Sequence, residues 1–193
     1  MSDIMISEIL HRSAEVKNKM ISVCAGPAEQ AAQMIAASMR KGGKLMLCGN
    51  GGSAGDSQHL AAEFVATLDH TKPRPSLPAL SLTTDTSFLT AYANDFGFED
   101  VFARQVEALG QPGDVLLGIS TSGNSKNVLA AAKAAKDNQI SVIAFTGETG
   151  GQMADFADLL VAIPSRIIMH IQECHIALGH AITARVETLL SEK

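Results

Sequence analysis

The chain contains 193 residues, 46% of them apolar, which is enough for one domain with a substantial core. Its formal net charge of -5 argues against nucleic acid as a partner, so any anion must be captured locally. The cysteines Cys24, Cys48 and Cys174 show no C-x-x-C spacing, and we see neither a membrane-spanning run nor a secretory signal, so we expect a cytoplasmic protein without membrane contact.

Two helices are predicted before the first strand. Apolar residues recur with helical spacing over 3–23, and Pro27 is well placed to begin a second helix that runs to Arg40. The pair Gly42-Gly43 then ends that helix. These helices need a surface to cover, which is either the sheet of their own chain or another subunit.

Five apolar runs are predicted to be strands, with helical patterns between them. The predicted strands are 44–48, 78–82, 114–119, 140–145 and 158–163, and the predicted helices are 54–66, 86–94, 98–109, 125–137 and 167–190, with a short turn near 150–155. Strands that alternate with helices form a parallel sheet. Ligands of such a sheet bind at the carboxyl ends of strands, near a switch in strand order.

The segment 48–63 carries the first candidate site. Its glycine-rich turn, Gly49 to Ser53, lies between a predicted strand and a predicted helix, so backbone N–H groups there can approach an anion closely. His59 and Glu63 follow at i and i+4, on one face of the helix and about one turn apart. The segment thus combines a phosphate cradle with a metal-ligand or acid/base pair.

A second turn of this kind, Ser-Thr-Ser-Gly-Asn-Ser at 120–125, also joins a strand to a helix. Hydroxyls, free N–H groups and the positive helix end all favour a phosphate. Neither turn matches a nucleotide P-loop or a dinucleotide motif. Gly and Ser are also common in such turns simply because they bend the chain and cap helices. Two such turns, one of them followed by His59 and Glu63, favour a ligand site.

The last helix carries polar side chains at Gln172, Glu173, His175 and His180. His175 and His180 lie about 140° apart around the helix and cannot share a face, whereas Gln172 and His180 differ by about 80°. Eight residues of helix rise about 12 Å. Gln172 and His180 therefore meet one metal ion only if both side chains lean towards each other, or if different chains supply them.

Five sequence blocks, taken in order, resemble the phosphoheptose isomerase branch of the sugar isomerase (SIS) family. They are Cys-Gly-Asn-Gly-Gly-Ser with Gln-His-x-x-x-Glu, Leu-Thr-Thr-Asp-Thr-Ser, Ala-Asn-Asp-Phe-Gly-Phe, Gly-Ile-Ser-Thr-Ser-Gly-Asn-Ser and Ile-Gln-Glu-x-His. The resemblance implies a homotetramer of α/β subunits with a doubly wound, flavodoxin-like sheet of five parallel strands and active sites between subunits. We expect one SIS domain over 1–193, comprising N-terminal helices for oligomer packing (1–41), an α/β core (42–165) and a long C-terminal helix (166–193).

The resemblance also implies a reaction and a site. The family converts sedoheptulose 7-phosphate to D-glycero-D-manno-heptose 7-phosphate, the first step towards ADP-heptose and the lipopolysaccharide core. It implies one zinc ion per subunit, which would be held here by His59, Glu63, Gln172 and His180. The implied substrate-binding residues are Asn50, Gly51, Gly52, Ser53, Glu63, Asn94, Asp95, Ser120, Thr121, Ser122, Ser125 and Gln172.

A ketose–aldose isomerisation moves a proton between C1 and C2 and passes through an enediolate. We hypothesise that Glu63 and His180 are the catalytic acid/base pair and that zinc polarises the substrate oxygens. The alternatives are an isomerase of another phosphosugar, such as a pentose phosphate, and a non-catalytic SIS regulator that binds a phosphosugar or a replication initiator. Regulators of the replication type change the acidic residue that matches Glu63, which this chain retains.

Three positions depart from the family pattern. Many relatives carry Gly-Arg where this chain has Ala66-Thr67, which raises the question whether Arg74 or Lys72 replaces that arginine. Relatives usually have Arg at His170, and some have Asp at Met169. These changes bear on substrate positioning, and they leave the four implied zinc ligands in place.

Overall fold

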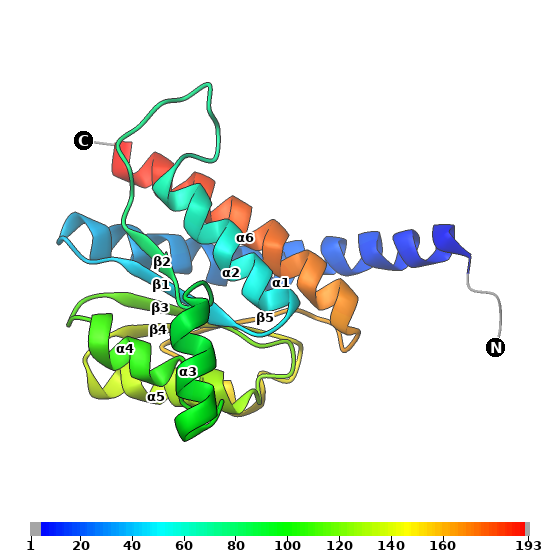
Figure 1. Ribbon diagram of the computed structural model, residues 1–193. Helices are drawn as coiled ribbons and strands as arrows, with labels where there is room; N and C mark the ends of the chain where they lie inside the picture. Colours follow the sequence, from blue (N-terminus) through cyan, green and yellow to red (C-terminus); the bar gives the residue numbers. More distant parts are fainter. Residues whose placement is uncertain (1–4, 192–193) are drawn as a thin grey trace.

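The computed structural model describes residues 5–191 and shows a parallel sheet between two layers of helices (Figure 1). In chain order the elements are α1 (Ile6–Arg40), β1 (Leu45–Gly49), α2 (Gly52–Val65), β2 (Ala79–Ser81), α3 (Thr86–Phe96), α4 (Ala103–Leu109), β3 (Val115–Ile119), α5 (Lys126–Asp137), β4 (Ser141–Thr146), the 3-10 helix η1 (Gly151–Asp155), β5 (Leu159–Ala162) and α6 (Ile168–Ser191). The predicted start of the first helix at residue 3 and the last two residues of the predicted C-terminal segment lie outside the described residues.

The five strands form one sheet in the order β2-β1-β3-β4-β5, and every neighbouring pair is parallel. The register of the central pair runs from Leu45 opposite Val115 to Gly49 opposite Ile119. The chain places β2 on one side of β1 and β3 on the other, so the strand order reverses between β1 and β3. The predicted doubly wound, flavodoxin-like sheet is confirmed.

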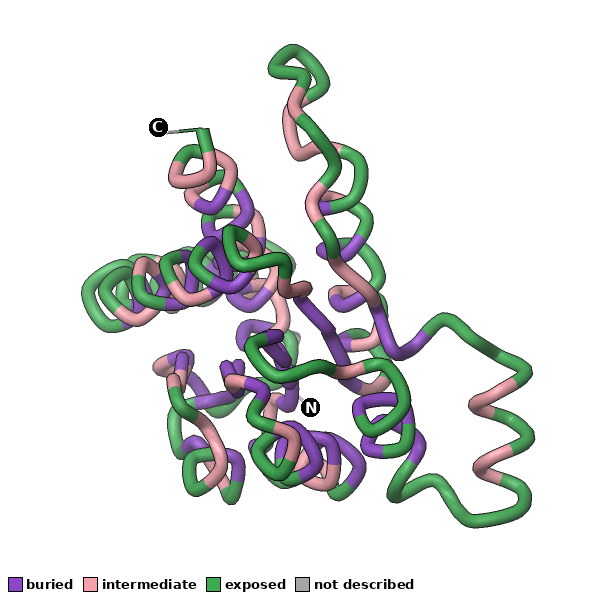
Figure 2. The backbone as a smooth tube through the Cα atoms, turned by 90° about the vertical axis from the view of Figure 1, so that its left-hand side faces the viewer, coloured by how far each residue is buried: buried purple, intermediate pink, exposed green. Residues whose placement is uncertain are grey.

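Helices cover both faces of the sheet. Every residue of β1 and β3 is buried, as expected for parallel strands that are covered on both sides. Alternate strand residues such as Leu45 and Leu47 pack with α1, α2 and α6, whereas Met46 and Leu116 pack with α4 and α5 on the other face. Figure 2 shows the buried positions concentrated in the strands and on the inner sides of the helices.

The N-terminal segment forms one helix, so the prediction of two helices is wrong. Helix α1 contains 35 residues and has Pro27 in its interior. A proline there removes the N–H that would bond the Val23 carbonyl, although its φ is compatible with a helix. The buried face continues across this point: Met20, Cys24, Ala28, Ala31 and Ala32. Packing of this face against α6 and β5 keeps both halves in one helix despite the lost bond.

The predicted helix 98–109 forms only in its second part, because α4 begins at Ala103. Gly97 ends α3 with a φ of 98°, and turns follow over 98–102. Val101, Phe102 and Ala103 are all buried. Three consecutive buried residues do not fit one face of a helix, whose successive side chains differ by about 100° in direction. The turns direct these side chains into the core on the α4–α5 face.

Within the described residues, no helix combines the length and the apolar character that crossing a bilayer requires. The other predicted helices and strands agree with the structure to within a few residues at each end, and the predicted turn near 150–155 is η1.

Candidate functional site

The two predicted glycine and hydroxyl turns lie side by side. Each follows one of the two central strands, and Gly49 at the end of β1 is paired with Ile119 at the end of β3. A reciprocal pair of amide hydrogen bonds, each 2.8 Å, joins Asn50 after β1 to Asn127 in the first turn of α5. The turns therefore form one edge of the molecule at the switch in strand order, which is where a doubly wound sheet binds its ligands.

The first turn leads directly into α2. Gly51 adopts a φ of 56°, a conformation that favours glycine, and its carbonyl accepts from the N–H groups of Ala54 and Gly55. A Cβ on Gly52 would lie 2.5 Å from Nε2 of Gln172, so α6 approaches the start of α2 closely. The buried Ser53 donates its N–H to the Asn50 carbonyl and stabilises the turn. The first turn is thereby held against both α5 and α6.

Helices α2 and α6 run side by side in the same direction, as the matching contacts along their lengths show (Figure 1). Gln172 meets Gly52 near the start of both helices, and a Cβ on Gly179 would lie 2.6 Å from the Leu60 side chain. Next to that close approach, Nε2 of His180 lies 2.8 Å from Nε2 of His59. Because the two helices run in the same direction, Gln172 lies beside the start of α2 and His180 lies beside His59.

His59, Glu63 and His180 form the polar centre of this helix pair. Nε2 of His59 lies 3.5 Å from Oε1 of Glu63, and the two imidazole rings meet edge to face. The His59 side chain is 49% exposed and that of Glu63 is 21% exposed, so solutes can reach the cluster. A 2.8 Å contact between two ring nitrogens requires one of them to carry the proton and the other to accept it. The cluster therefore combines two imidazoles in hydrogen-bond contact with a carboxylate.

A single chain brings His180 to His59 and Gln172 to the start of α2. Gln172 and His180 of one α6 thus both lie against α2 of the same chain, the first at Gly52 and the second at His59. His175 points elsewhere, as its angular position predicted: it is buried, and its Nε2 lies 3.1 Å from the Thr146 carbonyl. Burial lowers the pKa of His175 to about 4, although its hydrogen bond to Thr146 opposes the shift.

The second turn gathers three serine hydroxyls at the start of α5. Oγ of Ser120 lies 2.9 Å from Oγ of Ser125 and 3.4 Å from Oγ of Ser122. Gly123 has a φ of +66°, and a Cβ there would lie 2.0 Å from the Gly150 carbonyl oxygen, so only glycine fits. Thr121 is half-buried beside them and accepts from the Gly147 N–H. The three hydroxyls thus bond to one another at the positive end of α5, and hydroxyls and a helix start are groups that favour a phosphate.

Asn94 and Asp95 do not join the histidine–glutamate cluster. They lie on α3, which packs through Leu89 and Tyr92 on the α4–α5 face of the sheet, whereas α2 packs on the opposite face. Their exposed side chains bond to each other, with Asn94 Nδ2 donating to Asp95 Oδ1 at 2.8 Å. Within one chain these two residues are separate from the rest of the predicted site.

Sequence reasoning missed Asp56 and Asn127. Asp56 lies one turn before His59 on α2, and its Oδ2 is one of the buried side-chain atoms in the described residues that lack a hydrogen-bond partner. Burial raises the pKa of Asp56 above its usual range, and the nearby His59 opposes the shift. The spacing of Asp56 and His59 was visible in the sequence, whereas the pairing of Asn127 with Asn50 spans 77 residues and left no local signal.

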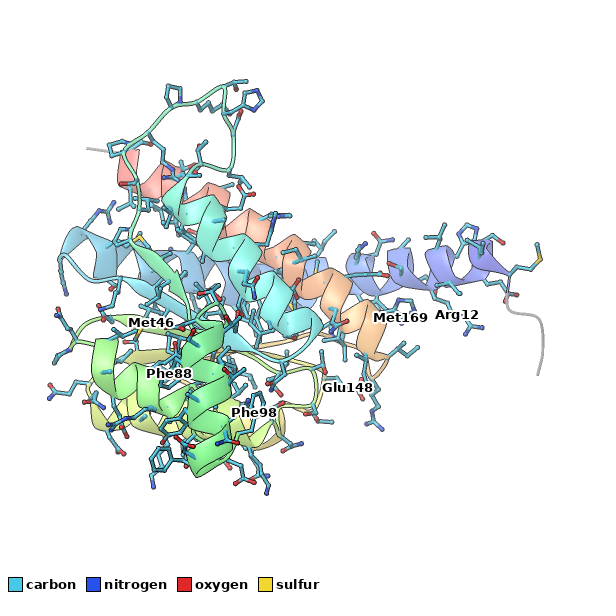
Figure 3. All side chains as sticks on the ribbon, in the orientation of Figure 1. Arg12, Met46, Phe88, Phe98, Glu148 and Met169 are labelled. Carbon is cyan, nitrogen blue, oxygen red and sulfur yellow. The ribbon has the colours of Figure 1, made fainter. Side chains whose placement is uncertain are left out.

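The positions that depart from the family pattern have distinct surroundings. His170 is 1% exposed, and its Nδ1 lies 3.7 Å from Oε2 of Glu173. Met169 is exposed at the start of α6 (Figure 3). Glu173 also accepts a hydrogen bond from Ser13 of α1, so this partly exposed carboxylate joins two helices.

Over the described range 5–191, no three His, Cys, Asp or Glu side chains are already arranged around one metal ion. His59, Glu63 and His180 nevertheless supply two imidazoles and a carboxylate to one location.

Comparison with known proteins agrees with this architecture. The SIS domain profile matches residues 10–147. The phosphoheptose isomerase of Roseiflexus sp. (strain RS-1) is 49% identical over 189 residues, which cover 98% of this chain and 94% of that one. The phosphoheptose isomerase of Aquifex aeolicus is 48% identical over 188 residues, or 97% of each chain.

Solved structures give the same result. Phosphoheptose isomerase GmhA from Neisseria gonorrhoeae has a TM-score of 0.89 at 43% identity. The alignment covers 95% of this chain and 97% of the GmhA chain. The NanR protein of Vibrio vulnificus, solved with ManNAc-6P, has a TM-score of 0.67 at 14% identity. The alignment covers 95% of this chain and 64% of the NanR chain, and at this identity it shows a shared fold alone. The chain therefore belongs to the SIS domain family and, within it, to the phosphoheptose isomerases, which are enzymes.

Proposed function

We propose that this chain interconverts sedoheptulose 7-phosphate and D-glycero-D-manno-heptose 7-phosphate. The observation that carries the proposal is the meeting of His59, Glu63 and His180 beside the two turns, at the switch in strand order. The phosphoheptose isomerases that align with nearly the whole chain support the choice of substrate.

Glu63 and His180 are proposed to move the proton between C1 and C2. The reaction needs a base near the carbon acid and an acid for the oxygen. Glu63 is partly exposed and offers a carboxylate, while His180 is held by His59 with a ring nitrogen that exchanges protons. The two residues lie on adjacent helices, and both are next to His59.

The second turn is proposed to hold the 7-phosphate. Ser120, Ser122 and Ser125 present converging hydroxyls, and the start of α5 adds N–H groups and a positive helix end. Thr121, with the N–H groups of Gly51 and Gly52 and the hydroxyl of Ser53, is proposed to extend this surface towards α2. Asn50, Asn94 and Asp95 are proposed to contact sugar hydroxyls, although in this chain Asn50 is bonded to Asn127. Phosphate binding remote from C1 and C2 orients the reacting end.

The side chains present fit a zinc ion, which we propose as the cofactor, one per subunit. Two imidazoles and a carboxylate are a known donor set for catalytic zinc, and Gln172 would add an amide oxygen. His59, Glu63 and His180, which meet at one place on α2 and α6, would hold the ion. When bound, zinc would act as a Lewis acid on the substrate carbonyl.

We further propose a cytoplasmic homotetramer that acts in ADP-heptose and lipopolysaccharide core synthesis and binds neither nucleic acid nor membrane. The first half of α1 extends beyond the rest of the chain (Figure 1), and Ile6 and Leu10 there are 77% and 63% exposed. An apolar groove between α1 and α6, lined by residues that include Met20, Ile21 and Leu178, lies next to it. These surfaces support assembly, and three unpaired buried cysteines are typical of a reducing compartment.

A coupled assay with sedoheptulose 7-phosphate, run with chelator and then with added zinc, tests the reaction and the metal together. We expect turnover that chelation abolishes and zinc restores. Turnover insensitive to chelator would retain the isomerase and contradict the zinc assignment. Phosphosugar binding without turnover in any condition would instead identify a regulator, and turnover of a pentose phosphate alone would change the substrate.

A further inference from the structure

Arg74 binds the carboxyl end of the helix that carries His59 and Glu63. Its Nη2 donates to the main-chain carbonyl of Glu63 at 2.8 Å, and its Nη1 donates to that of Phe64 at 2.9 Å. The carbonyls in the last turn of a helix lack partners within the helix. The guanidinium donates to both carbonyls, of which that of Phe64 also accepts the N–H of Leu77, and it places a positive charge at the negative helix end. Arg74 thus holds the peptide of Glu63 itself.

The same guanidinium is anchored to α6. Its Nε lies 2.6 Å from Oε1 of Glu187, two turns beyond His180, and the two side chains are only 14% and 18% exposed. Oε1 of Glu187 also accepts the N–H of Leu68, in the segment between α2 and β2. With little solvent access, the guanidinium of Arg74 joins the carbonyls of Glu63 and Phe64 on α2 to the carboxylate of Glu187 on α6 in one geometry.

Helices α2 and α6 are therefore held together at three levels. Gln172 contacts Gly52 near the start of both helices, Gly179 packs against Leu60 beside the two histidines, and Arg74 with Glu187 closes the far end. Glu63 lies between the second and third levels. The third level is the hydrogen-bonded connection between the last turn of α2 and α6 on the carboxyl-terminal side of Glu63, where Phe64 also packs in the shared core.

We propose that Arg74, held by Glu187, is a positioning residue that keeps Glu63 in register with His180 for proton transfer. The inference rests on the proposed isomerase function. Arg74 does not replace the arginine that relatives carry at Ala66-Thr67 as a substrate contact, because all three of its guanidinium nitrogens already bind protein groups. Its effect on the substrate passes through the backbone of Glu63.

The test compares purified Arg74→Ala, Arg74→Lys and Glu187→Gln with the wild type. We expect Arg74→Ala to lower kcat per folded molecule by about 10- to 100-fold with KM within about twofold, because small misplacements of a reacting group cost rate more than binding. Arg74→Lys should recover part of the loss, because a lysine restores the charge without the fork. Arg104→Ala, which removes an exposed arginine on α4, is the matched control.

Amide hydrogen exchange gives a readout that does not depend on activity. Arg74→Ala should accelerate exchange at residues 63–66, while residues 52–58 at the start of α2 keep wild-type rates. A kcat of Arg74→Ala equal to that of the wild type, or a loss explained by the unfolded fraction alone, would overturn the proposal. A wild type without turnover would contradict the isomerase proposal. Hydrogen exchange would still test the role of Arg74, because unchanged exchange at residues 63–66 in Arg74→Ala would show that Arg74 does not hold Glu63.

Discussion

At the scale of single residues, the cluster His59, Glu63 and His180 combines accessibility with short contacts. The i, i+4 spacing of His59 and Glu63 was apparent in the sequence because helix geometry places such residues on one face. The partner His180 comes from 121 positions further along the chain. No local pattern specifies that contact, which depends on how α6 lies against α2.

We predict that Glu63→Gln lowers kcat by at least about 100-fold, the usual contribution of a general acid or base. Because the Glu63 side chain is partly exposed, the free energy of unfolding should change by less than about 1 kcal/mol. Steady-state kinetics and urea denaturation measure the two quantities. Glu107→Gln, at a 51% exposed position on α4, is the control. Normal turnover by purified Glu63→Gln would show that the acid/base assignment is wrong.

The buried His175 predicts a pH dependence of stability. Its pKa is about 4 in the folded chain, against an ordinary value of 6.5, so the unfolded chain binds the proton more tightly. The stabilisation by neutral His175 is complete above pH 6.5 and is lost as the pH falls towards 4. From pH 7 to pH 5 this residue alone should lower the free energy of unfolding by about 2 kcal/mol.

Urea denaturation of the wild type and of His175→Gln at both pH values isolates this contribution from that of the other titrating groups. The glutamine retains a donor for the Thr146 carbonyl, and it does not titrate. The variant should therefore lose about 2 kcal/mol less than the wild type between pH 7 and pH 5. An equal loss in both proteins would show that His175 is protonated in the folded chain.

At the scale of elements, the close approach of α2 and α6 requires glycine at position 179. Gly179→Ala should destabilise the protein by about 1–3 kcal/mol and lower kcat, since the added methyl group pushes Leu60 and the adjacent His180 apart. Gly55→Ala places its methyl group in open space on α2 and should stabilise the protein by about 0.5–1 kcal/mol. Chemical denaturation and an activity assay are carried out on both variants. Equal changes in stability and kcat for Gly179→Ala and Gly55→Ala would contradict the packing argument.

The turn after β3 gives a second prediction at this scale. Ser120→Ala with Ser122→Ala removes two of the clustered hydroxyls and should weaken phosphosugar binding by about 30-fold, because two hydrogen bonds of about 1 kcal/mol each sum to about 2 kcal/mol. Calorimetric titration measures the change, with Ser22→Ala on the exposed side of α1 as the control. An unchanged binding constant would place the phosphate elsewhere.

At the scale of the whole molecule, α1 presents an apolar surface that this chain does not cover. Leu10→Lys with Ile21→Lys adds two charges at positions that are 63% and 64% exposed. We expect a tetrameric wild type and a smaller assembly for the double variant, because buried charges oppose association. Sedimentation velocity measures both, and Leu109→Lys on α4 is the control. A monomeric wild type at micromolar concentration would contradict the tetramer.

The sequence by itself determined the alternation of strands and helices, both glycine and hydroxyl turns, and the pair His59 and Glu63. These features follow from periodicity and backbone preferences, which act between residues close along the chain. The sequence did not predict the continuity of α1 through Pro27, because a buried face on both sides of the proline outweighs its local preference.

Only the tertiary structure decided which distant side chains meet. The parallel course of α2 and α6 places His180 at His59, leaves His175 buried on another side, and seats Arg74 between Glu63 and Glu187. It also separates Asn94 and Asp95 from that cluster by the thickness of the sheet. Such contacts depend on packing across the whole core, which residue spacing along the chain does not encode.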